Sequence, residues 1–398
     1  MEDVFMRAKP SFLKIPGLIL VLCIPVVFCF SISLGSASQV QELEINPRTI
    51  QPTNGEAARI SFQIPAKAEA TVKIYDPSHF LMTALLENRV FEPGRHTVLW
   101  NGRDAAGRLV PDEAYYCTID LSYADGRHAS FNPASSGGVY LGVIPARLVK
   151  ESGTVSYSLS EPARIRIRAG VTNGPLYKTL LDWAPRTAGE QVLAWDGLDR
   201  SSSLSIWKKD DFVISASAFS LPPKSIIVTG TGISYIEYWT SRAREAGMGL
   251  FEYLRTSAPA REARLRAREI NQNVLSRSDV EISEYYLMNR FSNQPPMVSM
   301  KLGNGGQAEE GTIPRVSGSL QVMIEFSELT RQRLLEQRYE IILYVDDVMV
   351  LEDESGYTPY TWILDSSTLE NGEHVLTVNI ATLSDQVGTF SQKVVVDN

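Results

Sequence analysis

Side chains that commonly bind metals or transfer protons are sparse in this sequence of 398 residues. Its four histidines are far apart, at His79, His96, His128 and His374. None forms the H-x-x-x-H or H-E-x-x-H spacing that brings two imidazoles together on one face of a helix to bind zinc. The sequence therefore predicts no metal site.

Motifs for nucleotide binding and nucleophilic catalysis are also missing. The loop at residues 229–232, Thr-Gly-Thr-Gly, follows the apolar segment 226–228. A dinucleotide-binding loop needs a third glycine and a surrounding βαβ unit, so we interpret this loop as the end of a domain. The sequence contains no Gly-x-Ser-x-Gly elbow and no P-loop. We predict no catalytic residue, no cofactor-binding residue and no enzymatic activity.

Cysteine chemistry is limited in the same way. Cys23 and Cys29 lie in an N-terminal apolar segment, and the rest of the chain contains only Cys117. A single cysteine cannot form an internal disulfide. Alternation places Cys117 with Ile119 and Leu121 on the apolar face of a strand, which favours a small core side chain over a reactive thiol.

Acidic loops near the C terminus offer the remaining candidates for chemistry. Residues 346–347 (Asp-Asp) and 352–354 (Glu-Asp-Glu) could contribute oxygen ligands to calcium, although no full ligand loop is visible. The alternative is that these acids are solvated turns that protect an edge strand. The sequence leaves open whether two carboxylates are paired for glycoside hydrolysis, because that depends on the distance between them in the folded protein.

A tandem repeat indicates the elements that carry these residues. Residues 58–65 through the Trp-Asn-Gly-Arg-Asp of 100–104 recur as residues 153–160 through the Trp-Asp-Gly-Leu-Asp of 195–199, an offset of 195 − 100 = 95 residues. This period is too long for a solenoid unit and suits a whole β-sandwich domain. The expected architecture is a series of separate modules in a string.

The first copy shows several ordered segments of a known domain. They are Asn-Pro at 46–47, Ile-Pro at 64–65, Tyr-Asp at 75–76, Pro-Gly at 93–94 and Trp-Asn-Gly-Arg-Asp-Ala-Ala-Gly at 100–107. This pattern resembles the Ig-like domain of the flagellar hook-capping (FlgD) family. The resemblance covers residues 43–127 and, in a more diverged copy, 152–228. It implies a fold rather than hook capping, because the chain begins with an export signal.

The N terminus has the pattern of a targeting segment. Arg7, Lys9 and Lys14 precede an apolar stretch at residues 15–33 and small residues at 35–38. Residues 1–38 are therefore a cleaved signal peptide or an uncleaved N-terminal anchor. Both interpretations place the remainder outside the cytoplasm, in the periplasm, on the cell surface or secreted. The net charge of −8 argues against nucleic-acid binding.

Residues 237–292 are expected to form a helical connector. Ser257 followed by Ala258 and Pro259 is a typical helix start, and apolar residues then recur at helical spacing as far as Val274. The helix at 257–276 could be an arm that contacts a partner or an anionic surface. The alternative is a linker helix that rests on a neighbouring module. Residues 291–311 are predicted to be a linker.

The last module, residues 312–398, returns to strand patterns. Its Tyr-Val-Asp-Asp (344–347), Pro-Tyr-Thr-Trp (359–362) and Asn-Gly-Glu-His (371–374) segments resemble a second bacterial Ig-like family. In that family a Val-Asp-Gly turn stands where this chain has Val-Asp-Asp. Asp347 therefore leaves the tightness of this turn open.

The predicted fold is mainly β, with tandem Ig-like sandwiches and a short helical connector before the last module. The predicted role is that of an exported, non-catalytic structural or adaptor protein whose partners are other envelope or extracellular proteins. The membrane would be contacted only through residues 1–38, if uncleaved. One alternative is a carbohydrate- or surface-binding protein with exposed aromatic platforms, and another is an enzyme with a site between modules. The candidate platform residues are Trp183, Trp207, Tyr235, Tyr238 and Trp239.

Overall fold

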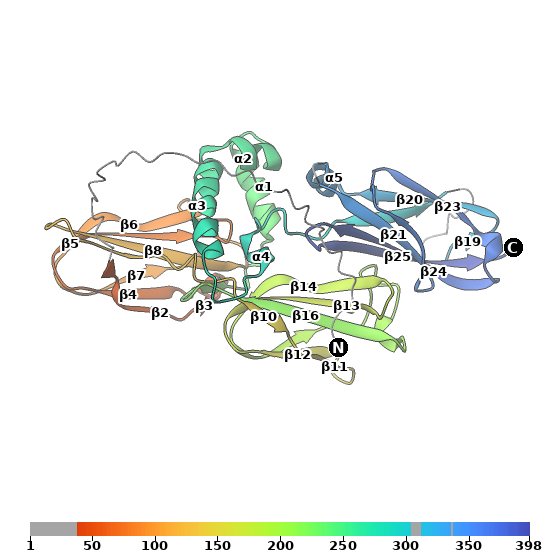
Figure 1. Cartoon of the computed structure of the whole chain (residues 1–398), viewed down its shortest axis with the longest axis horizontal. Helices are drawn as coiled ribbons and strands as arrows, with labels where there is room; N and C mark the ends of the chain where they lie inside the picture. Colours follow the sequence, from red (N-terminus) through yellow and green to blue (C-terminus); the bar gives the residue numbers. More distant parts are fainter. Residues whose placement is uncertain (1–37, 304–311, 336) are drawn as a thin grey trace, which may run out of the picture.

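The computed structural model describes residues 38–303, 312–335 and 337–398. The predicted signal peptide or anchor lies outside the described residues, apart from Ser38. The described chain is mainly β, with three sandwich modules and one helical segment, so the predicted fold class is confirmed (Figure 1). Within the described ranges, no helix is long and apolar enough to cross a membrane.

The first module packs two sheets in an Ig-like strand order. Alternation sends every second side chain, such as Ile60, Phe62 and Ile74, into the shared core. One sheet contains β2 (Gln41–Asn46), β4 (Ala58–Ile64) and β7 (Gly94–Trp100). The other contains β6 (Leu81–Phe91), β5 (Ala68–Tyr75), β8 (Ala114–Tyr123), β9 (His128–Phe131) and β1 (Ser38–Gln39). The short helix η1 (Pro52–Asn54) connects β3 (Thr49–Ile50) to β4.

The second module repeats this plan. One sheet contains β11 (Ala146–Val149), β12 (Thr154–Leu159) and β15 (Gly189–Ala194), and the other β14 (Leu176–Arg186), β13 (Ala163–Val171), β16 (Phe212–Ser220) and β10 (Tyr140–Val143). The short helix η2 (Ile206–Lys208) precedes β16. Every residue of β13 is buried, because one face enters the module's own core and the other meets neighbouring parts of the chain.

The two copies of the repeated segment form the same turn. Trp100 and Trp195 are buried, and each indole donates a hydrogen bond to the backbone oxygen three residues later, at 2.9 and 3.0 Å. Asp104 and Asp199 are also buried, and each accepts hydrogen bonds from backbone amides of its own turn. The repeat therefore preserves the residues that hold one strand connection in shape.

The glycine inside this turn gives a first prediction. Gly197 has φ +74°, and a Cβ there would lie 2.0 Å from the Trp207 ring. Gly107 has a similar φ of +79° but nothing within 4 Å, so it is the matched control. We expect Gly107→Ala to lower the free energy of unfolding by about 1–2 kcal/mol through backbone strain alone. Gly197→Ala should cost a further 1–3 kcal/mol, roughly, through the clash. Urea denaturation measures both, and equal losses would contradict the role given to Trp207.

A short strand, β17 (Ile226–Val228), joins the first two modules. It follows the last strand of the second module in sequence, yet it pairs antiparallel with β8 and parallel with β3 (Thr49–Ile50) of the first module. The strand of the second module that corresponds to β8 is β16. It pairs with β10, which comes before the repeated segment of the second module in sequence. The expectation of separate modules in a string is therefore wrong here, because a sheet of the first module contains a strand that follows the second module in sequence.

The helical segment packs on the first module. It contains α1 (Tyr235–Glu245), α2 (Leu250–Thr256), α3 (Ala258–Leu275) and α4 (Glu284–Leu287). Ser257 caps α3 as predicted, its hydroxyl accepting a hydrogen bond from the Ala260 amide. Trp239 of α1 is 2% exposed and belongs to the core of the first module, while Ile270 and Val274 of α3 pack beside the outward-facing Tyr75 and Tyr116 of its sheet. In Figure 1, α1 to α3 stand beside the strands β5, β6 and β8.

The prediction of a linker at residues 291–311 is wrong for its described part. Phe291 is 6% exposed, and its ring lies 5.0 Å from that of Tyr235 and 6.0 Å from that of Phe80. A strand, β18 (Val298–Leu302), then begins the last module. The proline and glycine residues that suggested a linker flank these buried pieces.

The last module is a third sandwich. One sheet contains β18, β20 (Ser319–Phe326) and β23 (Tyr360–Asp365). The other contains β19 (Arg315–Val316), β25 (Val387–Val396), β24 (Gly372–Thr382), β21 (Tyr339–Val345) and β22 (Val348–Asp353). The helices α5 (Glu328–Leu334) and η3 (Ser366–Thr368) connect strands. The predicted strands at 319–326 and 339–345 are confirmed.

Candidate functional site

The most distinctive cluster of polar side chains is a junction where all three modules and the helical segment meet. Its base is β13, in which Arg164, Arg166 and Arg168 alternate with Ile165 and Ile167. The isoleucines enter the core of the second module, whereas the arginine side chains are 7–9% exposed and bond to other parts of the chain. Charges so far from water require partners, and each arginine has one.

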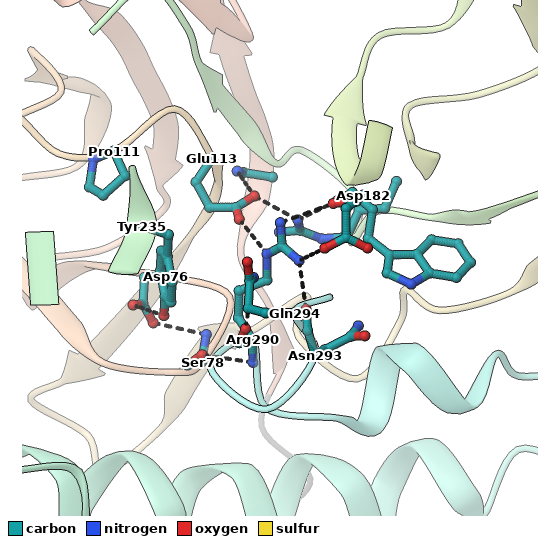
Figure 2. A network of polar contacts seen from close by, with 12 residues as sticks. Asp76, Ser78, Pro111, Glu113, Asp182, Tyr235, Arg290, Asn293 and Gln294 are labelled. Carbon is teal, nitrogen blue, oxygen red and sulfur yellow. Dashed lines mark hydrogen bonds and ion pairs between the residues drawn. The ribbon is translucent and has the colours of Figure 1, made fainter. Parts of the chain in front are cut away.

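At one end of the junction, two arginines bind one carboxylate of the first module. Glu113 lies 2.6 Å from Arg164 and 3.1 Å from Arg290, which follows α4. Arg290 also lies 3.4 Å from the Asp182 carboxylate of the second module and donates to the Asp182 backbone oxygen at 3.0 Å. Figure 2 shows Arg290 between Glu113 and Asp182, with Asn293 beside them. Burial disfavours the cation, but Glu113 and Asp182 outweigh this and raise the pKa of Arg290.

At the other end, the second and third modules share one carboxylate. Asp385 lies 2.6 Å from Arg166 and 3.1 Å from Arg168, and it accepts a hydrogen bond from the Tyr285 hydroxyl at 2.8 Å. The Arg166 guanidinium lies over the rings of Trp183 and Tyr285, 4.6 and 4.8 Å from their centroids. Burial opposes ionisation of Asp385, but Arg168 and Arg166 outweigh it and lower its pKa.

Further polar contacts strengthen the same interface. The Asn379 side chain of β24 accepts a hydrogen bond from the Leu176 amide and donates one to the Leu176 oxygen, both at 2.8 Å. Asp347 in the turn between β21 and β22 accepts hydrogen bonds from Tyr177 and Lys209 of the second module. The sequence left the tightness of this turn open. It is a tight turn in which Asp346 has φ 49° and Asp347 has φ 73°, and Asp347 contacts the second module.

A buried carboxylate also anchors the helical segment. Asp76 accepts hydrogen bonds from the backbone amides of Ser78 and Phe80, the Tyr235 hydroxyl at 2.7 Å and the Trp239 indole at 3.2 Å. All four donors are neutral. Burial therefore dominates and raises the pKa of Asp76 to about 7, although hydrogen bonds from Tyr235, Phe80 and Ser78 oppose the shift.

This raised pKa predicts a dependence of stability on pH. Between about pH 4 and 7 the folded protein keeps a proton on Asp76 that the unfolded chain has lost, so Asp76 makes the protein less stable as the pH rises. Asp76→Asn cannot titrate here and serves as the reference. The wild-type advantage over this variant in unfolding free energy should shrink with rising pH, by at most about 1.4 kcal/mol per unit. Urea denaturation across this range measures the difference, and a constant difference would contradict the prediction.

A small cavity of about 50 Å³ lies within the junction. Its walls include Arg164, Arg290, Trp183, Tyr285 and His79. Burial, helped by Arg266, lowers the pKa of His79 to about 4, so this imidazole is neutral at physiological pH. The space suits a few water molecules rather than a substrate. The arginine and Tyr285 side chains around it have partners within the protein, since Arg164 and Arg290 bind Glu113 and the Tyr285 hydroxyl donates to Asp385.

The residues that the sequence singled out lie apart from one another. His374 forms a hydrogen bond with the Asp346 carboxylate, in the turn between β21 and β22 of the third module. Cys117 is 1% exposed, and burial raises the pKa of its thiol to about 12, which confirms a core side chain. The loop at 229–232 is tied back to the first module, since the Asp112 carboxylate accepts hydrogen bonds from Gly230 and Thr231. Among the described residues, no three His, Cys, Asp or Glu side chains converge as metal ligands do.

The candidate aromatic platforms are largely internal. Trp183, Tyr235, Tyr238 and Trp239 are 1–8% exposed, and only Trp207 is partly exposed. Sequence analysis missed the junction residues Arg164, Arg166, Arg168, Arg290, Glu113, Asp182 and Asp385. One signal was available in the Arg-Ile-Arg-Ile-Arg segment at 164–168. Alternation along a strand places the isoleucines on one face and a row of three arginines on the other, and such a row of cations needs partners if it is buried.

No protein-family model matches the sequence, and no curated protein is significantly similar to it. Three solved structures illustrate the structural similarities. FLGD from P. aeruginosa is 16% identical over 24% of this chain and 72% of its own, with a TM-score of 0.19. The fibronectin(III)-like modules of CbhA from Clostridium thermocellum are 16% identical over 25% of this chain and 97% of their own, with a TM-score of 0.18. A bacterial ice-binding adhesin is 11% identical over 91% of this chain and 99% of its own, with a TM-score of 0.17. These scores support no shared function, and the tandem Ig-like architecture rests on the strand order of the chain itself.

Proposed function

We propose that this chain is an exported, non-catalytic structural or adaptor subunit of a cell-envelope or extracellular assembly. Its first two modules would be sandwiches of the hook-cap type, used for their shape. Its partners would be other envelope or extracellular proteins. In this proposal the modules hold binding surfaces at fixed positions relative to one another, which suits a subunit more than a flexible tether.

The observation that carries the proposal is the charged junction. Arg290 joins Glu113 of the first module to Asp182 of the second, and Asp385 of the third module binds Arg166 and Arg168 of the second. Interfaces between domains of one chain usually permit relative motion unless they are large and well packed. Ion pairs buried across both boundaries, together with the shared strand β17, oppose such motion.

The two alternative functions have less support. Carbohydrate binding would use exposed aromatic platforms, and four of the five candidate side chains are committed to packing. A hydrolytic site between modules would need unengaged carboxylates facing a cleft. Glu113, Asp182 and Asp385 at the boundaries are each bound to arginines. These observations favour the structural proposal.

The native size of the protein tests this proposal. The untagged protein would be extracted at its natural level with mild detergent and separated by size, and comigrating proteins would be identified by mass spectrometry. We expect a large particle with companions in fixed stoichiometry. A free monomer near the mass of the mature chain would refute the subunit proposal, and glycan-binding and activity screens would then follow.

A further inference from the structure

The third module has one open side. β22 is the last strand of its sheet and pairs only with β21, and β23 is the last strand of the other sheet and pairs only with β20. The opposite side of the sandwich ends in β18 and in the two-residue strand β19, which pairs with β25. Within the described ranges, the outer backbone groups of β22 and β23 therefore have no strand neighbour. Such edges are templates for the addition of a further strand.

The exposed side chains of β22 are mostly apolar. Val348, Met349 and Val350 are consecutive and are 66%, 45% and 48% exposed. An ordinary edge strand would alternate apolar and polar residues, and three successive exposed apolar residues usually indicate a contact surface. Tyr357, in the loop to β23, and Ile363, on β23, are also exposed apolar side chains, at 54% and 58%.

Carboxylates surround this apolar strand. Glu352 pairs in register with Ile342, which places it on the same face of the sheet as Glu340 of β21. Burial, together with the nearby charges of Glu352 and Glu354, raises the pKa of Glu340. No ion pair to Glu340, Glu352 or Glu354 occurs within the described part of the chain. The edge is therefore negative as well as apolar, which favours a positively charged partner.

We propose that β22 is a docking edge for an extended, basic segment of a partner protein, which adds to the sheet as a further strand. Apolar side chains of that segment would cover Val348, Met349 and Val350, and its lysines or arginines would lie near Glu340 and Glu352. The same charges disfavour pairing with a second copy of this edge, because like carboxylates would face one another. The irregular register that leaves Val350 without a partner residue on β21 further limits such self-association. This inference rests on the proposed adaptor function and names the chemistry of one partner.

Synthetic peptides test the edge directly on the full chain. The probe is a short peptide of alternating lysine and valine, and the control is the same peptide with glutamate in place of lysine. Fluorescence anisotropy measures binding, and hydrogen–deuterium exchange measures protection of the backbone amides. We expect the lysine peptide to bind in a salt-dependent way and to slow exchange in residues 348–353, whereas the glutamate peptide should not bind.

Matched variants separate the edge from general charge effects. Glu352→Lys with Glu354→Lys should weaken binding of the lysine peptide by about tenfold or more. The control is another edge strand, β15, where Val192 is 70% exposed and Glu190 is also exposed. Glu190→Lys with Val192→Thr should leave binding unchanged, whereas Glu352→Lys alone, which changes the net charge by the same amount, should still weaken it. Both pairs of substitutions are on the surface, and a thermal melt confirms that the proteins fold.

Three results would overturn the proposal: equal binding of both peptides, binding without protection of residues 348–353, or binding that Glu352→Lys with Glu354→Lys leaves unchanged. A dimer that forms through β22 would also overturn it. These failures are distinct from failure of the proposed function. A large native particle with companions could still be found if the peptides do not bind, and the assembly would then use another surface.

Discussion

Replacing Arg290 with alanine should lower the free energy of unfolding by about 3–5 kcal/mol, as measured by urea denaturation. The guanidinium is the only cation that contacts both Glu113 and Asp182 among the described residues. Without it, Asp182 loses its ion pair, and Glu113 keeps only Arg164, in a region from which water is largely excluded. We also expect a less steep unfolding transition, because the variant removes one of the links between the first two modules while Arg164–Glu113 and the pairing of β17 remain.

An exposed ion pair provides the control for this experiment. Arg95 lies 2.7 Å from Glu44, and its side chain is 46% exposed. Arg95→Ala should change the unfolding free energy by about 0–1 kcal/mol, because such pairs gain little over solvation by water. If Arg290→Ala costs no more than Arg95→Ala, the junction does not hold the modules together, and the main support for the proposed function is lost.

Trp239→Ala should destabilise the protein by a similar amount, about 3–5 kcal/mol. The Trp239 ring is 2% exposed and lies 4.2 Å from the Phe80 ring of the first module, and its indole also donates to Asp76. Removing it leaves a large void at the place where α1 meets the sheet. Urea denaturation measures the loss, and limited proteolysis should show faster cleavage within α1 to α3.

Trp207 is the matched control for Trp239, since it is a tryptophan that is only partly buried. Trp207→Ala should therefore cost clearly less. A deletion of residues 240–290 would not test the interpretation of the helix as an arm that contacts a partner, because these helices contribute to the core of the first module. Loss of a partner in that deletion would reflect damage to the module, and an unchanged stability of Trp239→Ala would restore the arm interpretation.

The local parts of the fold follow from sequence patterns. Alternation predicts β4, β20 and β21 with their observed limits, because short-range periodicity decides which face of a strand is buried. The capping residue Ser257 predicts the start of α3 for a similar reason. The repeated tryptophan and aspartate predict a shared turn, since both side chains bond within a few residues of themselves.

Long-range features were not predictable in this way. β17 has the pattern of any buried strand, and nothing in three apolar residues says which sheet it joins. The partners of Arg164 and Arg166, which are Glu113 and Asp385, belong to other modules, so sequence spacing carries no information about them. The predicted helical connector at 237–292 contains most of α1, but its spacing does not show that Tyr238 and Trp239 pack into the core of the first module.

The pairing of β17 with β3 and β8 also makes the first module discontinuous along the chain. Thr49 of β3 lies beside Ile227, with the whole second module between them in sequence. The other strands of the first sandwich are synthesised long before β17, which completes it. The edge of β8 that pairs with β17 therefore stays uncovered while the second module is synthesised. Contacts at such separation form late and slow folding. Acquisition of the native state should therefore be a joint event for both modules, with the second sandwich delivering the last strand of the first.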